Sequence, residues 1–225
     1  MSDLKETVLE AALDHVPFDG WSEATLAAAI EDTGADPGAV RAVYPRGAVD
    51  LALAFHRRGD AEMVARLESE DLDAIKIRDK ITHAVRLRLD LMEGRKEAVR
   101  RGTTLFALPI HAADGARALW ETADAIWTAI GDSSDDINWY TKRMTLSGVY
   151  SATVLFWLGD SSEGHMATWG FLDRRIGDVM QIEKLKAQMR DSKLLAPLMA
   201  GPNWLMSRVK APTTPTDMPG SWRRD

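Results

Sequence analysis

The stretch GWSEATLAAAIEDTGADPGAVRAVYPRGAVDLALAF, residues 20–55, decides the fold. Ser22 is a helix-capping residue type, and the apolar spacing after it is helical as far as Gly34, which favours the left-handed end of a helix. Asp36 and Pro37 then supply a cap and a first-turn proline for a short second helix. Two short helices joined by a tight turn predict a helix-turn-helix, a geometry that can place a helix in the DNA major groove.

The same helical spacing of apolar residues continues on both sides of this stretch. Upstream, one apolar face runs from Leu4 to Val16 and ends at the breakers Pro17, Asp19 and Gly20. Downstream, the pattern predicts longer helices over about 48–68, 71–92, 96–105, 114–130, 136–158 and 163–189. Sustained two-residue alternation is scarce, so we expect an all-α chain. Its expected parts are a helix-turn-helix-like lobe (1–47), a helical bundle (48–190), an amphipathic segment (191–210) and a disordered tail (211–225).

Residues 20–55 resemble the opening of TetR-type regulators. In that family a three-helix lobe precedes a larger helical bundle that binds a ligand and dimerises, so the resemblance implies a TetR-like fold and a homodimer through the last long helices. The segment departs from the family in the helix that reads DNA. TetR-type recognition helices usually end in two aromatic residues and a basic one, whereas this chain has Val43, Tyr44 and Pro45.

Charge argues against DNA as the partner of this lobe. The whole chain carries a formal charge of −6, but residues 1–50 hold three basic residues against ten acidic ones. A protein that reads DNA needs several phosphate contacts from Lys and Arg, and an acidic lobe repels the duplex. We therefore expect no nucleic-acid partner. A TetR-type regulator with a hydrophobic effector remains the alternative function.

A second resemblance covers about residues 20–190, most of the chain, and includes GWSEATL (20–26) and VYPRGAVDL (43–51). Residues 135–184, DDINWYTKRMTLSGVYSATVLFWLGDSSEGHMATWGFLDRRIGDVMQIEK, are similar to the signature region of the COQ9 family of ubiquinone-biosynthesis accessory proteins. The resemblance implies a protein that binds an isoprenoid or quinone precursor and presents it to the demethoxyubiquinone hydroxylase, without being the catalyst. The first residues lack the features of a mitochondrial presequence, so we expect a bacterial member of the family.

The residues themselves also fail to predict catalysis. The chain has no cysteine, which excludes thiol chemistry and fits a reducing compartment. None of the five histidines completes the Glu-x-x-His pair of a bundle di-iron site, and no phosphate-binding glycine motif occurs. We expect no metal and no cofactor apart from a bound isoprenoid or other lipid. An enzyme that acts on the lipid is a further alternative.

Large apolar residues just after the helix predicted over 96–105, and in the next two predicted helices, are the candidates for lining a lipid pocket. Bundles place ligands between such helices, although the same residues can simply fill a core. The candidate lipid-binding residues are Phe106, Leu108, Trp120, Trp127, Tyr150, Val154, Phe156 and Trp157.

A third set begins the helix predicted to start near residue 136. Two adjacent aromatic residues at a helix start cannot both face the core, and an exposed Trp or Tyr beside Arg is typical of a protein interface. The resemblance implies that this patch docks the hydroxylase; the alternative is that Trp139 packs inward. The candidate partner-binding residues are Asn138, Trp139, Tyr140, Lys142 and Arg143.

The end of the chain combines an apolar stripe with positive charge. From residue 184 onward there are eight basic residues against three acidic ones. Such a segment can lie on an anionic bilayer, or it can fold back on the bundle. The candidate membrane residues are Leu194, Leu195, Leu198, Met199, Trp204 and Leu205. We expect a cytoplasmic protein that is peripherally associated with the inner face of the membrane.

Overall fold

The structure is a computed structural model that describes residues 2–191, with the side chains of residues 3–181. Its helices, in chain order, are α1 (Ser2–Asp19), α2 (Glu23–Thr33), α3 (Pro37–Val43), α4 (Ala48–Glu68), α5 (Ile77–Asp90), the short 3₁₀ helix η1 (Glu93–Arg95), α6 (Lys96–Phe106), α7 (Ala112–Ala129), α8 (Ile137–Gly159), the short 3₁₀ helix η2 (Glu163–His165) and α9 (Met166–Asp191). No strand occurs in this part of the chain, which confirms the all-α prediction.

The capping residues predicted for the first lobe are confirmed. The Ser22 hydroxyl accepts a hydrogen bond from the Thr25 amide at 3.2 Å, and Gly34 ends α2 in the left-handed region with a φ of 62°. The Asp36 carboxylate accepts from the Ala39 amide at 2.7 Å and begins α3. These caps satisfy helix-end amides that would otherwise lack partners, and so they fix the turn between α2 and α3.

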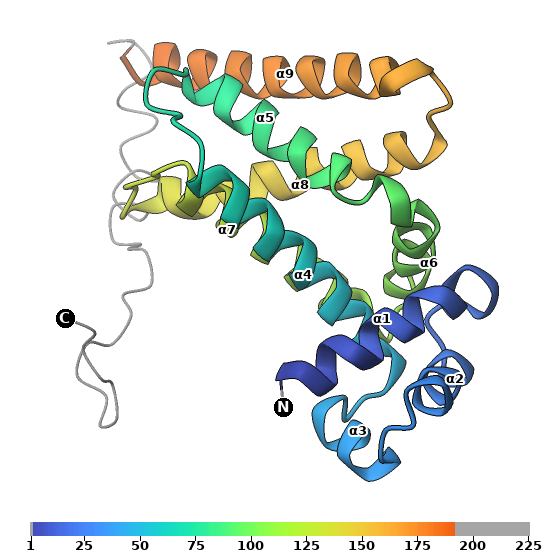
Figure 1. Ribbon diagram of the computed structural model, residues 1–225. Helices are drawn as coiled ribbons and strands as arrows, with labels where there is room; N and C mark the ends of the chain where they lie inside the picture. Colours follow the sequence, from blue (N-terminus) through green and yellow to red (C-terminus); the bar gives the residue numbers. More distant parts are fainter. Residues whose placement is uncertain (1, 192–225) are drawn as a thin grey trace, which may run out of the picture.

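The longer helices surround a core in which α8 is central. Figure 1 shows α1, α2 and α3 in blue at one end of the molecule and α9 in orange along the opposite side. Helix α8 packs against both α7 and α9, and α4 packs against α7 and α5. Trp157 of α8 is fully buried, together with Ile126 of α7 and Leu172 of α9. Burying such large apolar side chains is the main source of the bundle's stability.

Hydrogen bonds from Trp21 and Arg46 are among the contacts that join the first lobe to the bundle. The Trp21 indole, which precedes α2, donates a hydrogen bond to the Ala98 carbonyl of α6 at 3.0 Å. Arg46, between α3 and α4, donates to both carboxylate oxygens of Asp114 at 2.9 Å. The lobe is therefore held against α6 and α7.

The first helix ends among its predicted breakers, because α1 continues past Pro17 to Asp19 and Gly20 follows with a φ of 66°. Two other predicted helix limits are wrong. Helix α5 begins at Ile77 rather than at residue 71, since the Asp71 side chain accepts from the Asp73 amide and forms a turn. Residues 163–165 form a 3₁₀ turn before α9.

Candidate functional site

A cavity of about 440 Å³ lies between α4, α5, α6, α7 and α8. Its wall is mainly apolar and includes Trp21, Phe55 and Val154. The cavity opens to solvent on the side where its lining residues are exposed, namely Ala107, Ala112, Ala116 and Leu155. Volumes of ~300–1,000 Å³ with apolar walls and a few polar groups are typical of sites for small ligands. The cavity is thus large enough for a small molecule or for part of a larger lipid.

A glycine shapes the mouth of this cavity. A Cβ on Gly115 of α7 would lie 2.7 Å from the Cβ of Phe106, the last residue of α6. Only glycine lets the end of α6 come this close to α7, and Phe106 thereby becomes part of the cavity wall. The short chain between the two helices, which carries the exposed side chains of Leu108 and Ile110, runs on from Phe106.

The opposite side of the cavity carries buried polar groups from α4 and α5. Arg88 of α5 is 2% exposed, and its Nε donates to Asp60 of α4 at 2.7 Å. Its Nη2 donates to the His56 carbonyl at 2.9 Å. The flat guanidinium fits against α4 at Gly59, where a Cβ would be 2.6 Å from the Arg88 Cζ. A buried charge is tolerated when it is paired and hydrogen-bonded, as this one is.

His56 and Thr122 extend the same hydrogen-bonded group. The Thr122 hydroxyl donates its proton to the Asp60 carboxylate, whose two oxygens lie 3.1 and 3.0 Å away. The His56 Nε2 lies 2.7 Å from the same hydroxyl. Because the hydroxyl proton is already used, the His56 Nε2 is assigned as the donor of that second hydrogen bond. Burial lowers the pKa of His56, against a smaller raising effect of the Asp60 charge. The imidazole is therefore neutral near pH 7, and it lines the cavity without adding charge.

A second cavity, of about 410 Å³, lies between α5, the start of α8 and α9. Its described lining is apolar on the α5 and α9 sides and polar near Ser133, Ser134 and Asn138. Trp127 of α7 also lines it, with the Lys142 ammonium 5.0 Å from the centre of the indole ring. This cavity is separate from the polar group around Arg88.

Three aromatic rings cluster where α7 faces the start of α8. The ring centres of Trp139 and Tyr140 are 4.8 Å apart, and that of Trp120 lies 5.7 Å from Trp139 and 6.3 Å from Tyr140. All three side chains are half-buried, so each keeps part of its surface toward solvent. We call Trp120, Trp139 and Tyr140 the aromatic patch.

A buried, paired arginine packs against the aromatic patch. Arg143 is 2% exposed, lies 4.0 Å from the Trp139 ring centre and pairs with Asp124 and, at 3.1 Å, with Asp132. Burial raises the pKa of Asp132, but hydrogen bonds from Lys142, Ser134 and Arg143 outweigh it and leave the pKa below its ordinary value. Arg143 and Lys142 are thus engaged within the fold, whereas the predicted Asn138 is exposed.

The structure separates the candidate lipid-binding residues into three groups. Phe106, Tyr150 and Val154 line the first cavity, and Trp127 lines the second. The remaining four line neither: Leu108 is exposed, Trp120 is in the aromatic patch, Phe156 stacks on Phe171 with ring centres 4.6 Å apart, and Trp157 is in the core.

Sequence reasoning missed the polar side of the first cavity. A signal was present, because Arg88 falls at helical spacing after the apolar Ile81, Ala84 and Val85, all of which are buried. An arginine on an apolar face predicts a buried acidic partner, and Asp60 is that partner. Trp21 and Phe55 were missed because they reach the cavity only through tertiary packing.

The cations of the helix-turn-helix are already paired. Arg41 of α3 donates to Glu23 at 2.8 Å, and Arg46 pairs with both Asp50 and Asp114. The two basic residues nearest the end of α3 are therefore held by carboxylates of the protein itself.

The described part of the chain contains neither a metal-binding cluster nor a membrane-spanning helix. Residues 2–191 contain no group of three or more ligand-type side chains placed to hold a metal ion. No helix in that range combines the length and apolar character needed to cross a bilayer. The candidate membrane residues lie outside the described residues: Leu194, Leu195, Leu198, Met199, Trp204 and Leu205.

Comparison with known proteins gives two family matches in this chain. The model described as COQ9 matches residues 112–183, and the model described as "Ubiquinone biosynthesis protein COQ9, N-terminal domain" matches residues 2–30. The first match contains α7, α8 and the start of α9, and so it includes both the aromatic patch and one wall of the first cavity.

Curated relatives and a solved structure agree with these matches. The mitochondrial ubiquinone biosynthesis protein COQ9 of Drosophila melanogaster is 31% identical over 189 residues, 82% of this chain and 58% of that protein. Its namesake in Homo sapiens is 28% identical over 196 residues, 84% of this chain and 61% of that protein. The chain therefore spans about 60% of the length of these relatives. A TetR transcriptional regulator from Nitrosomonas europaea superposes with a TM-score of 0.62 at 19% identity, over 78% of this chain and 97% of that one, which confirms the TetR-like fold.

Proposed function

The chain belongs to the COQ9 family, and on that premise we propose that it is a lipid-binding accessory protein of ubiquinone biosynthesis. It binds an isoprenoid or quinone precursor in the first cavity and presents it to the demethoxyubiquinone hydroxylase. The protein makes no bond in the lipid itself, and the bound lipid is its only cofactor-like ligand.

The observation that carries the proposal is the apolar cavity between α4 and α8. Its rim includes the exposed Leu155 of α8 and Ala107, and the chain that runs on from Ala107 exposes Leu108 and, at 79%, Ile110. Exposed apolar surface that continues a cavity is costly in water, and it is typical of a site that a long apolar ligand covers. An isoprenoid tail has the chemistry to fill such a site.

Docking and membrane contact complete the proposal. The aromatic patch binds the hydroxylase, because partly exposed Trp and Tyr rings contribute strongly to protein interfaces. Residues 194–205 bring the protein to the inner face of the membrane, where its lipid resides.

A homodimer forms through α8 and α9, whose exposed apolar residues include Met144 and Met166. Sedimentation of the purified protein tests this dimer.

The same observations disfavour the two alternatives. A TetR-type regulator needs free cations on its DNA-reading helix, but Arg41 and Arg46 are paired with carboxylates. An enzyme acting on the lipid needs activated groups in the cavity. The polar side chains that line it are a neutral imidazole, a paired guanidinium, a phenol and the hydroxyls of Thr103 and Ser151, which donate to carbonyls of their own helices. A salt-dependent DNA shift at submicromolar protein, or turnover of a quinone precursor by the protein alone, would favour the respective alternative.

Removal of the protein from a ubiquinone-producing host tests its role in the cell. We expect demethoxyubiquinone to accumulate and ubiquinone to fall, and the wild-type protein to restore both when it is returned. Lipid extracts analysed by mass spectrometry give the two pools. Unchanged ubiquinone and demethoxyubiquinone in the host without the protein would contradict the proposal.

A further inference from the structure

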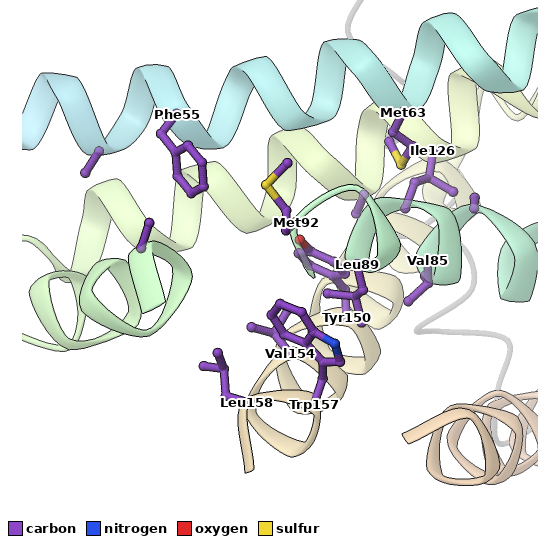
Figure 2. Close-up of a cluster of buried hydrophobic side chains, with 14 of the residues drawn as sticks. Phe55, Met63, Val85, Leu89, Met92, Ile126, Tyr150, Val154, Trp157 and Leu158 are labelled. Atoms are coloured by element: carbon purple, nitrogen blue, oxygen red, sulfur yellow. The ribbon is translucent and has the colours of Figure 1, made fainter. Parts of the chain in front are cut away.

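One polar group on the wall of the first cavity has no hydrogen-bond partner among the described residues. Tyr150 of α8 lines the cavity and is 3% exposed, and its hydroxyl makes no hydrogen bond with any described residue. Figure 2 shows Tyr150 rising from α8 toward Met92, with Leu89 beside it; both of these residues also line the cavity. The hydroxyl oxygen is not sealed in the core and opens on the cavity space, and the hydroxyl of a buried Tyr ordinarily finds a hydrogen-bond partner. The group therefore calls for a partner inside the cavity.

The surroundings of Tyr150 determine what that partner can be. Burial raises the pKa of Tyr150, although the nearby Arg88 charge lowers it, so the phenol keeps its proton and can donate a hydrogen bond. The Arg88 charge is itself matched by Asp60 at 2.7 Å. With no net charge at this side of the cavity, an anionic head group would be desolvated without compensation. A neutral oxygen acceptor suits the site.

The two sides of the first cavity differ in their exposure to solvent. Tyr150, Arg88 and Leu89 on one side are all nearly inaccessible, whereas Ala116 and Leu155 on the other are exposed. A volume of about 440 Å³ is near the lower end of ligand sites, so it accommodates a ring and a short length of tail. The rest of a long tail must leave through the mouth, beside Ala116 and Leu155.

We propose that the Tyr150 hydroxyl holds a neutral carbonyl or hydroxyl oxygen of a ring at the buried end of the cavity, so that the lipid enters ring first and its tail lies toward the mouth. This inference rests on the proposed lipid-binding function and adds its orientation and the residue that recognises the ring. In this state the ring is shielded from water, and presentation to a partner requires its withdrawal through the mouth.

Replacing Tyr150 by Phe removes the hydroxyl and keeps the ring. The probes are a quinone with one isoprene unit and β-farnesene, an isoprenoid hydrocarbon that has no oxygen. We expect Tyr150→Phe to weaken quinone binding roughly tenfold, the equivalent of about 1.4 kcal/mol for one hydrogen bond, and to leave β-farnesene binding unchanged. The control is Tyr44→Phe, since the Tyr44 hydroxyl is bonded to the Lys5 carbonyl and lies outside the cavity lining.

Two further measurements separate recognition from a merely structural effect. The unliganded Tyr150→Phe protein should unfold at the same urea concentration as the wild type or a higher one, because the lost hydroxyl has no partner there. A quinone labelled with ¹³C at its carbonyls should show a lowered carbonyl stretching frequency on binding to the wild type but not to Tyr150→Phe.

The outcomes distinguish this inference from the function on which it rests. Equal quinone affinity in both proteins, or a parallel loss of quinone and β-farnesene binding, overturns the ring-first orientation while the cavity keeps its role in lipid binding. If the wild type binds neither probe, the proposed function fails and the orientation fails with it.

Discussion

The Nε of Arg88 lies 2.7 Å from the Oδ1 of Asp60, and this pair joins α5 to α4 beside the cavity. Both side chains are nearly inaccessible to water. Arg88→Met leaves an unpaired buried carboxylate, so we expect the free energy of unfolding to fall by about 3–5 kcal/mol, measured by urea denaturation. Arg57→Met, which breaks the exposed pair between α4 and Glu121 of α7, should cost less than about 1 kcal/mol. Similar losses in the two variants would contradict a buried, structural ion pair.

The second prediction concerns the space that Gly59 leaves for the Arg88 guanidinium. An added methyl group would be 2.6 Å from the Arg88 Cζ, so Gly59→Ala should displace the guanidinium and reduce stability by about 1–3 kcal/mol. Gly177 of α9 has no described atom within 4 Å of its would-be Cβ, and Gly177→Ala should stabilise the protein by up to about 1 kcal/mol. Thermal denaturation of both variants checks the opposite signs; a gain from Gly59→Ala would show that the guanidinium is not fixed there.

Acid should destabilise the protein through His56. Its pKa is lowered in the fold by burial, so below about pH 6.5 the unfolded chain takes up a proton that the folded chain does not. Above the ordinary pKa, the contribution of His56 to the free energy of unfolding is fully present. It decreases by up to about 1.4 kcal/mol per pH unit as the pH falls from the ordinary pKa toward the pKa in the folded protein. Urea denaturation between pH 7.5 and 5.5 measures the slope, in a range above the ordinary titration of carboxylates.

His56→Gln supplies the comparison for this pH dependence. The variant loses a hydrogen bond to Thr122, so its stability at pH 7.5 is lower, but its dependence on pH should be much flatter. The slopes are compared, not the absolute stabilities. Equal slopes in the two proteins would assign the acid sensitivity to other groups.

The aromatic patch should determine hydroxylase binding. Tyr140→Ala and Trp139→Ala remove half-buried rings that contact one another, and interface residues of this type lose more than about 2 kcal/mol of binding when truncated at a hot spot. We expect a loss of more than tenfold in affinity in a pull-down titration, with a melting temperature near that of the wild type for Tyr140→Ala. Phe18→Ala removes an 82% exposed aromatic side chain from the first lobe and should change neither quantity. Retained binding by both patch variants would move the docking surface elsewhere.

Local sequence signals predicted the fold well, and the cavity only in part. Ser22, Gly34 and Asp36 act on their own chain neighbours, so their roles as caps were readable from spacing alone. The candidate lipid-binding residues on α8 could not be sorted in this way. Tyr150 and Val154 line the cavity, whereas Trp157, one turn after Val154, packs with its ring centre 4.7 Å from the Lys96 ammonium. Helical spacing identifies an apolar residue without saying whether it meets a core or a cavity. That depends on where α4, α5 and α6 pack.

The most direct test of lipid binding in the first cavity is the lipid that the purified protein retains. Mass spectrometry of extracts should find close to one isoprenoid or quinone-type lipid per chain of wild-type protein made in a ubiquinone-producing host. Ala116→Trp, which places an indole at the exposed mouth of the cavity, should lose most of it, while Ala113→Trp, exposed on the same helix but outside the lining, should retain it. Wild-type protein without lipid, or equal lipid in all three proteins, would contradict the account.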